Sequence, residues 1–418
     1  MMDKLVIHGQ KKLDGIIPIS GAKNAVLPVM VATLLAPGEY RISKVPDLRD
    51  TRTMLRLLKL IGVSGKFENN ELYIDTRQAS NPEAPYDLVK TMRASFYVLG
   101  PLTARFGHAK VSLPGGCAWG PRPVNFHLSS LKAMGADIQL DEGYVITNTD
   151  RLQGAEITFD FPSVGATGNA VMAAVLAEGR SVIRNAAREP EIACLCHFLQ
   201  AMGANIVGTG SATLSIEGME KLHPADFEVI PDRIEAATFL IAGAMVGDRV
   251  TVKGVNPDHL TTIFEKLRLS GQEITVDDDQ VTVRKIGSII PVDVSTAVYP
   301  GFPTDVQAQW MALMSIAEGT SIITDTVYHD RFTHVAELGR LGARVSLTDN
   351  VAVVAGRKVL KGAPVMSTDI RASASLILAG LAANGRTDIS RVYHIDRGYE
   401  RIEEKLKGLG ADIRRESE

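Results

Sequence analysis

The hydrophobic positions of the chain recur with a period of about 70 residues. Six segments end in the same pattern, a leucine four positions before a glycine, and read LKLIG, LKAMG, LQAMG, LRLSG, LGRLG and LKGLG. The six glycines are Gly62, Gly135, Gly203, Gly271, Gly342 and Gly410. Glycine directly after the last apolar turn is a common helix stop. We therefore predict six amphipathic helices that end at these glycines and cover outer faces of the fold.

A second set of six helices is predicted from runs of small and apolar residues between the first six. Two of these runs read GATGNAVMAAVLAEG and IRASASLILAGLAANG. Alanine, serine and glycine lie on every side of such helices, so we expect close neighbours all round and complete burial. The six runs begin near Ala22, Met92, Ala166, Arg233, Asp305 and Arg371.

Short β-rich runs follow the helices and complete a repeating module. Each module reads as a buried helix, a strand, an outer helix, and one or two further strands. Its length exceeds that of ordinary solenoid repeats, which favours supersecondary modules over a stacked array. A chain of 418 residues is long for a single core, so we expect two domains with three modules each. Predicted strands include 71–75, 137–140, 144–147, 205–207, 213–216, 281–284 and 344–347.

Composition narrows the class of protein. Hydrophobic residues make up 45% and charged residues 22%, as in ordinary globular proteins. A net charge of −3 excludes a generally basic nucleic-acid surface but allows a local cationic pocket. The first residues, MMDKLVIHGQ, are no secretory leader, and no apolar run is long enough to span a bilayer. Three cysteines form no disulfide framework. We expect a cytoplasmic protein without membrane or nucleic-acid partners; the sequence sets no oligomeric state.

The stretch Leu113–Leu128, LPGGCAWGPRPVNFHL, predicts a loop, since dense glycines weaken helix and strand alike. It places Cys117 a few residues from Arg122, and a nearby fixed cation favours the reactive thiolate. The alternative is a surface loop with an incidental cysteine. The CLCHF stretch predicts no metal site, because Cys194 and Cys196 would point about 200° apart on a helix.

Polar residues mark the starts of the buried helices. Asp232, Asp369 and Ser163 are explained as ordinary N-caps. Lys23, Arg93 and Arg371 are not, because a cation at the positive end of a helix is unfavourable unless an anion binds there. We expect the six helix starts to face one cleft between the two domains that binds anionic ligands.

Several longer motifs occur in order between about Leu5 and Ile413: GAKNA, PGGCAWGPRP, PSVGAT, NAAREPEI, IPDRIE, FPTDVQAQ, DIRASASL and YHIDRGYERI. Together they make the chain resemble the UDP-N-acetylglucosamine 1-carboxyvinyltransferase family of enolpyruvyl transferases. One alternative is a shikimate-pathway enolpyruvyl transferase of the same fold, which lacks the cysteine loop as it stands here. Another is a catalytically idle paralogue that senses a nucleotide sugar.

The resemblance implies a fold. It is an α/β, two-domain inside-out α/β barrel with three repeated βαβαββ-type units per domain. Residues 1–20 plus 231–418 would form the C-terminal-type barrel domain. Residues 21–230 would form the catalytic barrel domain that carries the Cys117 loop. The two chain crossings, near Ser20 and Pro231, would form a hinge.

The resemblance also implies a reaction. The enolpyruvyl group of phosphoenolpyruvate passes to the 3′-hydroxyl of UDP-N-acetylglucosamine by addition and elimination, with release of phosphate. This is the first committed step of peptidoglycan precursor synthesis, and it requires no cofactor and no metal. Cys117 would be the general acid and the target of fosfomycin, and Asp305 would accept the hydroxyl proton.

The same resemblance assigns three groups of residues. The implied catalytic residues are Cys117, Asp305, Lys23 and Arg397. The implied phosphoenolpyruvate ligands are Lys23, Asn24, Arg122, Arg331, Arg371 and Arg397. The implied nucleotide-sugar ligands are Arg93, Arg122, Pro123, Val124, Asn125, Phe126, Ser163, Val164, Gly165, Asp305 and Val327. The chain departs from the usual family pattern at Trp119, Asn125, Phe126 and Phe161.

Overall fold

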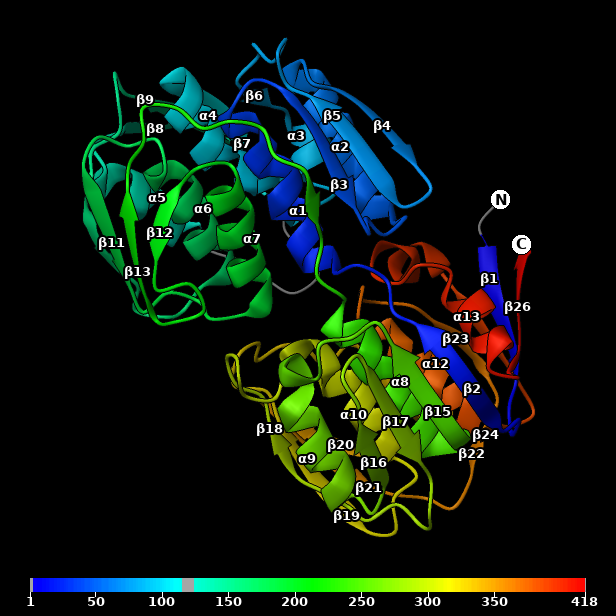
Figure 1. Ribbon diagram of the computed structural model, residues 1–418. Coiled ribbons are helices and arrows are strands. Elements are labelled where there is room, and N and C mark those ends of the chain that lie inside the picture. Colours follow the sequence, from blue (N-terminus) through cyan, green and yellow to red (C-terminus); the bar gives the residue numbers. More distant parts are fainter. Residues whose placement is uncertain (1–2, 115–123, 418) are drawn as a thin grey trace. The chain divides into compact units, whose positions relative to one another are not determined.

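The computed structural model describes residues 3–114 and 124–417, which divide into two compact units (Figure 1). Unit 1 comprises the chain up to Ser20 and from Pro231 onward, and unit 2 comprises Gly21–Ile230. Each unit has its own hydrophobic core of buried aliphatic and aromatic side chains. Within the described ranges, no helix is both long enough and apolar enough to cross a membrane.

Unit 2 contains three four-stranded sheets. In each sheet the first strand named below runs parallel to the second, and the remaining pairs are antiparallel. The sheets are β14 (Phe227–Glu228), β3 (Glu39–Ser43), β5 (Glu71–Asp75), β4 (Ser64–Glu68); β6 (Glu83–Ala84), β7 (His108–Ser112), β9 (Tyr144–Asn148), β8 (Asp137–Asp141); and β10 (Glu156–Thr158), β11 (Arg180–Arg184), β13 (Thr213–Glu217), β12 (Asn205–Val207).

Unit 1 repeats this topology in three more sheets and adds the short pair β22 (Leu360–Lys361) and β24 (Ala383–Asn384). The sheets are β2 (Leu13–Pro18), β15 (Gly247–Lys253), β17 (Gln280–Arg284), β16 (Glu273–Val276); β18 (Val294–Ser295), β19 (Thr320–Thr324), β21 (Val351–Ala355), β20 (Arg344–Thr348); and β23 (Pro364–Met366), β25 (Arg386–Ser390), β1 (Asp3–His8), β26 (Asp412–Ser417). The last sheet is completed by the N-terminal strand β1, which pairs with both β25 and β26; Figure 1 shows it beside β26.

The predicted fold class is confirmed, with three βαβαββ units in each of the two units. The helices that follow the parallel edge strands are the buried ones. All ten residues of α12 and all eight of α10 are buried. In α12, small side chains let neighbours approach from every side. The buried helices are α1 (Lys23–Ala32) with η1 (Thr33–Leu35), η2 (Arg93–Val98) with α4 (Leu99–Phe106), α6 (Val164–Ala174), α8 (Arg233–Val246), η4 (Thr304–Val306) with α10 (Gln307–Met314), and α12 (Ser373–Ala382).

The helices of the first set also form, and the six predicted stop glycines all adopt positive φ angles between 86° and 101°. This left-handed conformation closes a helix and favours glycine, which has no Cβ. These helices are α2 (Arg49–Ile61), α5 (Asn125–Ala133), α7 (Pro190–Ala201), α9 (Thr261–Leu269), α11 (His334–Arg340) and α13 (Ile402–Gly408).

Helix α7 is an outer helix with a narrow exposed face, formed by His197, Gln200 and Ala201. Eight of its twelve residues are buried, and it packs against α1. Its sequence, PEIACLCHFLQA, is apolar on most sides, so it needs cover on most sides. The connecting elements are α3 (Tyr86–Val89), η3 (Pro257–Leu260) and η5 (Val392–Arg397).

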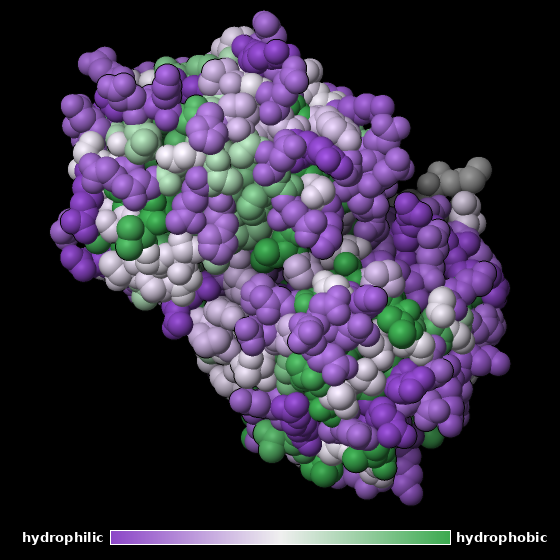
Figure 2. Space-filling view, viewed as in Figure 1, coloured by the Kyte–Doolittle hydropathy of each residue, from purple (hydrophilic) through white to green (hydrophobic). Residues whose placement is uncertain are grey.

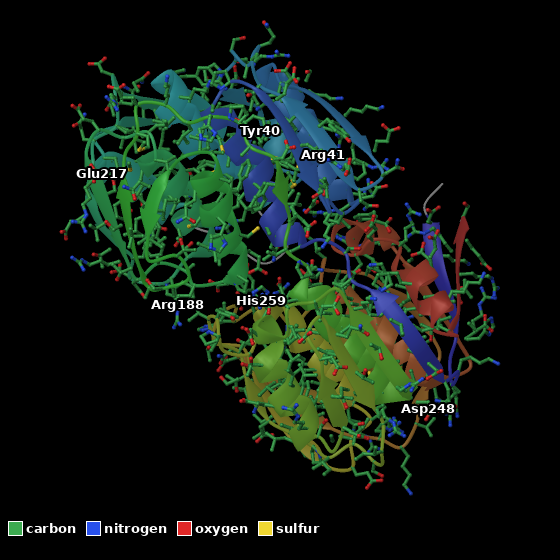
Figure 3. All side chains as sticks on the ribbon, viewed as in Figure 1. Tyr40, Arg41, Arg188, Glu217, Asp248 and His259 are labelled. Carbon is green, nitrogen blue, oxygen red and sulfur yellow. The ribbon has the colours of Figure 1, made fainter. Side chains whose placement is uncertain are left out.

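Charged and polar side chains cover most of the face of each unit that Figure 2 shows. Glu217 of β13 and Asp248 of β15 are examples of the outward-directed side chains of the sheets (Figure 3). The sheets therefore have one face toward the buried helices and one toward water, as the alternating burial of β3 and β11 shows.

Candidate active site

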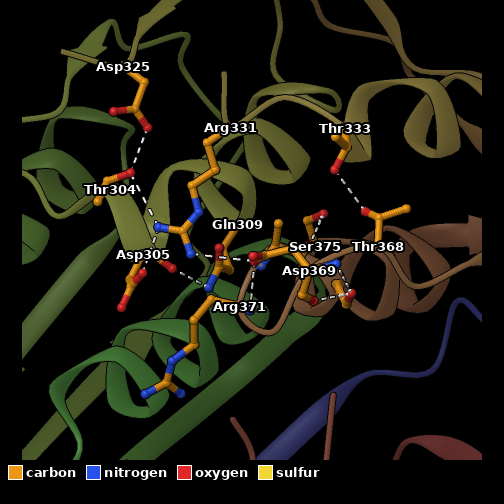
Figure 4. Close-up of polar contacts among 12 residues, drawn as sticks. Thr304, Asp305, Gln309, Asp325, Arg331, Thr333, Thr368, Asp369, Arg371 and Ser375 are labelled. Carbon is orange, nitrogen blue, oxygen red and sulfur yellow. Dashed lines mark hydrogen bonds and ion pairs between the residues drawn. The ribbon is translucent and has the colours of Figure 1, made fainter. Parts of the chain in front are cut away.

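The starts of the three buried helices of unit 1 are joined by two arginines, and Figure 4 shows the contacts of the first, Arg331. Arg331, in the loop before α11, donates from Nη1 to Asp305 Oδ1 at 2.6 Å and pairs through Nη2 with Asp369 Oδ1 at 3.4 Å. Asp305 lies in the turn that begins α10, and Asp369 precedes α12. Arg331 thus connects two helix starts that are 64 residues apart in sequence.

Arg371 connects the third start. Its Nη2 donates to Asp232 Oδ2 at 2.6 Å, and Asp232 is the N-cap of α8, where Oδ1 accepts from the N–H groups of Ile234 and Glu235. Arg371 also donates from Nη1 to the Gly398 carbonyl at 2.6 Å and lies 5.0 Å from the Tyr399 ring centroid. Both partners of this ion pair are buried. Three carboxylates and two guanidiniums therefore occupy one end of the helix triplet.

Charge stabilises this cluster against the cost of burial. Burial alone would raise the pKa of Asp369, but the Arg331 guanidinium and the N–H groups of Arg371 and Ala372 lower it below the ordinary value. Burial would lower the pKa of Arg371, but the Asp232 carboxylate raises it above the ordinary value. The Asp369 carboxylate and the Arg371 guanidinium therefore both stay ionised at neutral pH.

Arg397 ends η5, one residue before the Gly398 carbonyl that Arg371 holds. Its position along the chain therefore places its backbone beside the Arg371 side chain. Val327 is held through a residue that the motifs did not point to, Asp325. Oxygen Oδ1 of Asp325 accepts from the Val327 N–H at 3.1 Å, and Oδ2 accepts from Thr304 Oγ1, the residue before Asp305, at 2.7 Å.

The predicted residues of unit 2 lie at other helix starts. Lys23 is the first residue of α1, followed by Asn24, and its Nζ lies 3.1 Å from Asp50 Oδ2. Asp50, in the first turn of α2, is nearly fully buried. Sequence reasoning did not identify Asp50, because its VPDLRD context carries no motif for a buried carboxylate.

Three further helix starts in unit 2 meet around His127. Its Nδ1 lies 3.0 Å from Asn169 Nδ2 of α6, and the same amide donates to the Phe96 carbonyl of η2, the helix that begins at Arg93. Because the amide nitrogen is a donor, Nδ1 accepts and the ring proton lies on Nε2. A Cβ on Gly165 would lie 3.2 Å from this Nε2, so the start of α6 is immediately adjacent.

This meeting point gathers most of the predicted nucleotide-sugar ligands of unit 2. Val124, Asn125 and Phe126 begin α5, and the Phe126 ring packs on Phe159 with centroids 5.7 Å apart. Ser163, the N-cap of α6, accepts from the Ala166 N–H at 3.3 Å. Phe161 is 42% exposed just before that cap. The motifs did not single out His127, although it directly follows the predicted ligands.

The predicted residues Cys117, Arg122 and Pro123, and also Trp119, lie outside the described ranges. The other two cysteines, Cys194 and Cys196, are buried free thiols of α7. Burial raises the pKa of Cys194 to about 11 and of Cys196 to about 12, so neither is a thiolate at neutral pH.

Each helix start presents backbone N–H groups and a positive dipole end, and the arginines add guanidinium forks. Such a set binds phosphate and carboxylate groups. Asp305, a carboxylate held by a cation, supplies a group that can accept a proton. Each unit therefore contains described residues suited to anion binding, and unit 1 adds a carboxylate suited to acid–base chemistry.

Comparison with known proteins gives consistent results. Residues 7–406 match the family profile described as EPSP synthase (3-phosphoshikimate 1-carboxyvinyltransferase). The chain is 54% identical to UDP-N-acetylglucosamine 1-carboxyvinyltransferase of Chlorobaculum parvum over 418 residues, 99% of each chain. It is 52% identical to the enzyme of that name from Geotalea daltonii over 417 residues, 100% of each chain.

Two solved structures share the fold. The enolpyruvyl transferase NikO from Streptomyces tendae superposes with a TM-score of 0.90 at 29% identity, covering 99% of both chains. An EPSP synthase from Acinetobacter baumannii superposes with a TM-score of 0.77 at 19% identity, covering 100% of both chains.

Proposed function

The chain belongs to the enolpyruvyl transferase family and is an enzyme, and from this membership we propose that it transfers the enolpyruvyl group of phosphoenolpyruvate to the 3′-hydroxyl of UDP-N-acetylglucosamine, with release of phosphate. The supporting observation is the identity of 51–54% over nearly the whole chain to relatives with this named activity. The EPSP synthase structure, at 19% identity, shares the fold alone. The reaction is the first committed step of peptidoglycan precursor synthesis and takes place in the cytoplasm.

Asp305 is the proposed base for the sugar hydroxyl. As the sugar 3′-hydroxyl loses its proton to Asp305, the 3′-oxygen attacks C2 of phosphoenolpyruvate. At the same time C3 gains a proton from Cys117. The Cys117 thiolate then takes back one proton from C3 of the resulting tetrahedral ketal while phosphate leaves from C2, which forms the vinyl group on the sugar. Arg331 Nη1 donates to Asp305 Oδ1 at 2.6 Å and thereby orients the carboxylate.

The proposed phosphoenolpyruvate site uses cationic side chains for both anionic groups of the substrate. Lys23, Arg122 and Arg397 bind its phosphate, and Arg331 and Arg371 lie near its carboxylate, with Asn24 orienting the molecule. Guanidinium groups match both anions bidentately. As phosphate departs, these cations stabilise the charge that develops on the leaving oxygens.

The proposed nucleotide-sugar site uses helix starts. Backbone N–H groups of Ser163, Val164 and Gly165 bind the diphosphate, with Arg93 and Arg122 nearby. The run Pro123–Phe126 lines the uracil site, and Val327 and Asp305 contact the sugar. The described geometry supports this grouping, since Asn169 of α6 lies 3.0 Å from His127 of α5 and donates to the Phe96 carbonyl of η2.

Phosphate release tests the proposal. Purified chain with phosphoenolpyruvate should release phosphate when UDP-N-acetylglucosamine is added and not when 3-phosphoshikimate is added. The Asp305→Asn variant should lose about 10²–10⁴-fold in kcat. Asp277→Asn, which changes an exposed carboxylate in the turn between β16 and β17, is the matched control and should keep full activity.

Two outcomes would replace this function. Release with 3-phosphoshikimate alone would assign the shikimate-pathway reaction. Binding of the nucleotide sugar with no phosphate release at saturating phosphoenolpyruvate would assign a sensor.

A further inference from the structure

The segment that carries Arg397 has a backbone that needs external support. It connects β25 to α13 and is bounded by two non-glycine residues in the left-handed region, Arg391 with φ 56° and Arg401 with φ 43°. Side chains disfavour this region, so such residues persist only where surrounding contacts determine the fold of the segment. The position of Arg397 therefore depends on what fastens its neighbours.

The residue before Arg397 is fastened to β26 by Arg415. Both terminal nitrogens of the Arg415 guanidinium donate to Asp396: Nη2 to Oδ1 at 2.6 Å and Nη1 to Oδ2 at 3.0 Å. The same guanidinium donates from Nε to Glu403 Oε1 of α13 at 2.6 Å. β26, α13 and β1 lie side by side in unit 1 (Figure 1), so Arg415 joins the segment to the sheet.

The residues after Arg397 are fastened by other elements. The Gly398 carbonyl accepts from Arg371 Nη1 at 2.6 Å. The Tyr399 hydroxyl lies 2.9 Å from Thr238 Oγ1 of α8 and accepts from Gln309 Nε2 of α10 at 3.0 Å. Arg397 thus lies between one anchor on β26 and a second on the buried helices.

The contact of Asp396 with β26 depends on one cation, the Arg415 guanidinium. Arg415 faces three carboxylates, Asp396, Glu403 and also Asp3, whose Oδ2 is 3.4 Å from Nη1. The Arg415 and Asp396 side chains are each 27% exposed, so water screens them only in part. Removing the guanidinium leaves three like charges that repel one another and push the Asp396 end of the segment away from β26.

We propose that Arg415 is a positioning residue for phosphoenolpyruvate, acting through Asp396 to hold Arg397 where it meets the phosphate. This rests on the proposed function, in which Arg397 binds that phosphate. Arg415 touches no substrate itself. Misplacement of a binding group by about 1 Å costs on the order of 100-fold in rate, so loss of the anchor should weaken phosphoenolpyruvate use far more than nucleotide-sugar use.

Four single variants test the proposal in the full chain: Arg415→Ala, Arg415→Lys, Asp396→Asn and the control Arg414→Ala. Arg414 is the neighbouring arginine of β26, but it pairs with Glu416 at the surface. We expect Arg415→Ala to lower kcat/KM for phosphoenolpyruvate roughly 30–100-fold, with KM for the nucleotide sugar within about twofold of the unchanged chain. Arg415→Lys should recover part of the loss, since lysine keeps the charge and loses the fork.

The double variant Asp396→Asn with Arg415→Ala should lose no more kcat/KM for phosphoenolpyruvate than Arg415→Ala alone, because both changes remove the same contact between Asp396 and Arg415. Equal losses for both substrates that track a lowered melting temperature would assign Arg415 a structural role and overturn the proposal. So would activity of Arg415→Ala equal to that of Arg414→Ala. If Arg415→Ala fails to fold, Arg415→Lys and Asp396→Asn test the proposal instead. The loss for phosphoenolpyruvate is then compared with the loss for the nucleotide sugar in these two variants.

Failure of the proposed function has a separate signature. In that case the unchanged chain releases no phosphate from phosphoenolpyruvate and UDP-N-acetylglucosamine. The positioning role is then judged by calorimetric titration with phosphoenolpyruvate alone. Arg415→Ala should bind it at least 10-fold more weakly than Arg414→Ala, and equal affinities would overturn the role.

Discussion

The buried ion pair between Asp232 and Arg371 should be the most costly polar contact of unit 1 to break from one side. Replacing Arg371 with Met removes the guanidinium, keeps much of the side-chain volume, and leaves the Asp232 carboxylate buried without it. The Arg371 side chain is 4% exposed and the Asp232 side chain 6%, and Arg371 Nη2 lies 2.6 Å from Asp232 Oδ2. Water therefore cannot take over the interaction.

The magnitude follows from these contacts. Removing one partner of a buried ion pair costs about 3–5 kcal/mol. Asp232 keeps two backbone N–H donors at 2.9 and 3.0 Å, which places the expected cost near the lower end, about 3 kcal/mol. In a unit of about 200 residues this lowers the melting temperature by roughly 6–12 °C.

Tryptophan fluorescence during thermal and urea unfolding is the assay. The chain has two tryptophans, and Trp310 is fully buried in unit 1, where Nε1 donates to the Val292 carbonyl at 3.1 Å. In a Trp119→Phe background the signal comes from Trp310 alone and reports unit 1.

The control is Arg386→Met, which breaks a pair with Asp388 of the same 2.6–2.7 Å length on the surface. There Arg386 is 47% exposed, and the expected cost is below about 1 kcal/mol. Asp232→Asn combined with Arg371→Met should cost less than the sum of the single changes by at least about 1 kcal/mol. If Arg371→Met costs no more than Arg386→Met, burial does not set the strength of this pair and the reasoning fails.

Three further outcomes are expected. Native chain treated with iodoacetamide at pH 8 should be labelled at Cys117 and not at the two thiols of α7, because burial raises the pKa of Cys194 to about 11 and of Cys196 to about 12; mass spectrometry of peptides locates the label. Burial, aided by the Arg93 charge, lowers the pKa of His127 to about 3, so its contribution to stability is complete above pH 6.5 and falls as the pH drops toward 3. Between pH 6.5 and 5 this loss is about 2 kcal/mol, and urea unfolding of His127→Gln should lack it. Gly356→Ala should destabilise unit 1 by about 1–3 kcal/mol in the same assay, since the new Cβ would lie 1.9 Å from a backbone carbonyl oxygen.

Each of these has a result that contradicts it. Native labelling, or a fosfomycin adduct, on Cys194 or Cys196 would place the reactive thiol in α7. A pH dependence of stability unchanged in His127→Gln would mean that the ring is already charged in the folded chain. The control for Gly356 is Gly339→Ala in α11, where a new Cβ meets nothing within 4 Å. It should stabilise by about 0.5–1 kcal/mol, and a similar loss in both variants would refute the steric argument.

Much of the architecture could be read from local patterns. A glycine after an apolar turn ends a helix through its own backbone freedom, so the stop at Gly62 and its five counterparts needed only a few neighbouring residues to predict. Runs of small residues predicted the buried helices for a similar reason, since side-chain size on each face decides how closely neighbours approach. The LxxxG ending also predicted α7 as an outer helix, and its exposed residues His197, Gln200 and Ala201 lie on one face.

The site was accessible only where a motif exists. Sequence motifs led to Arg331, Arg371 and Asp305 as ligands of a substrate. Nothing in the sequence indicated that Arg331 pairs with Asp305, or that Asp50 lies beside Lys23. The role proposed for Arg415 likewise depends on a contact between residues from different elements, which no local pattern records.

By itself, the sequence determined the repeat, the helix stops, the burial of six helices and the family, because each depends on short-range backbone and side-chain preferences or on contiguous motifs. Only the tertiary structure decided that β1 completes the sheet of β25 and β26, and that Arg371 meets Asp232 across 139 residues. Such pairings are set when distant segments pack together and buried charges must find partners. Their free energy belongs to the assembled core and not to any stretch of the chain.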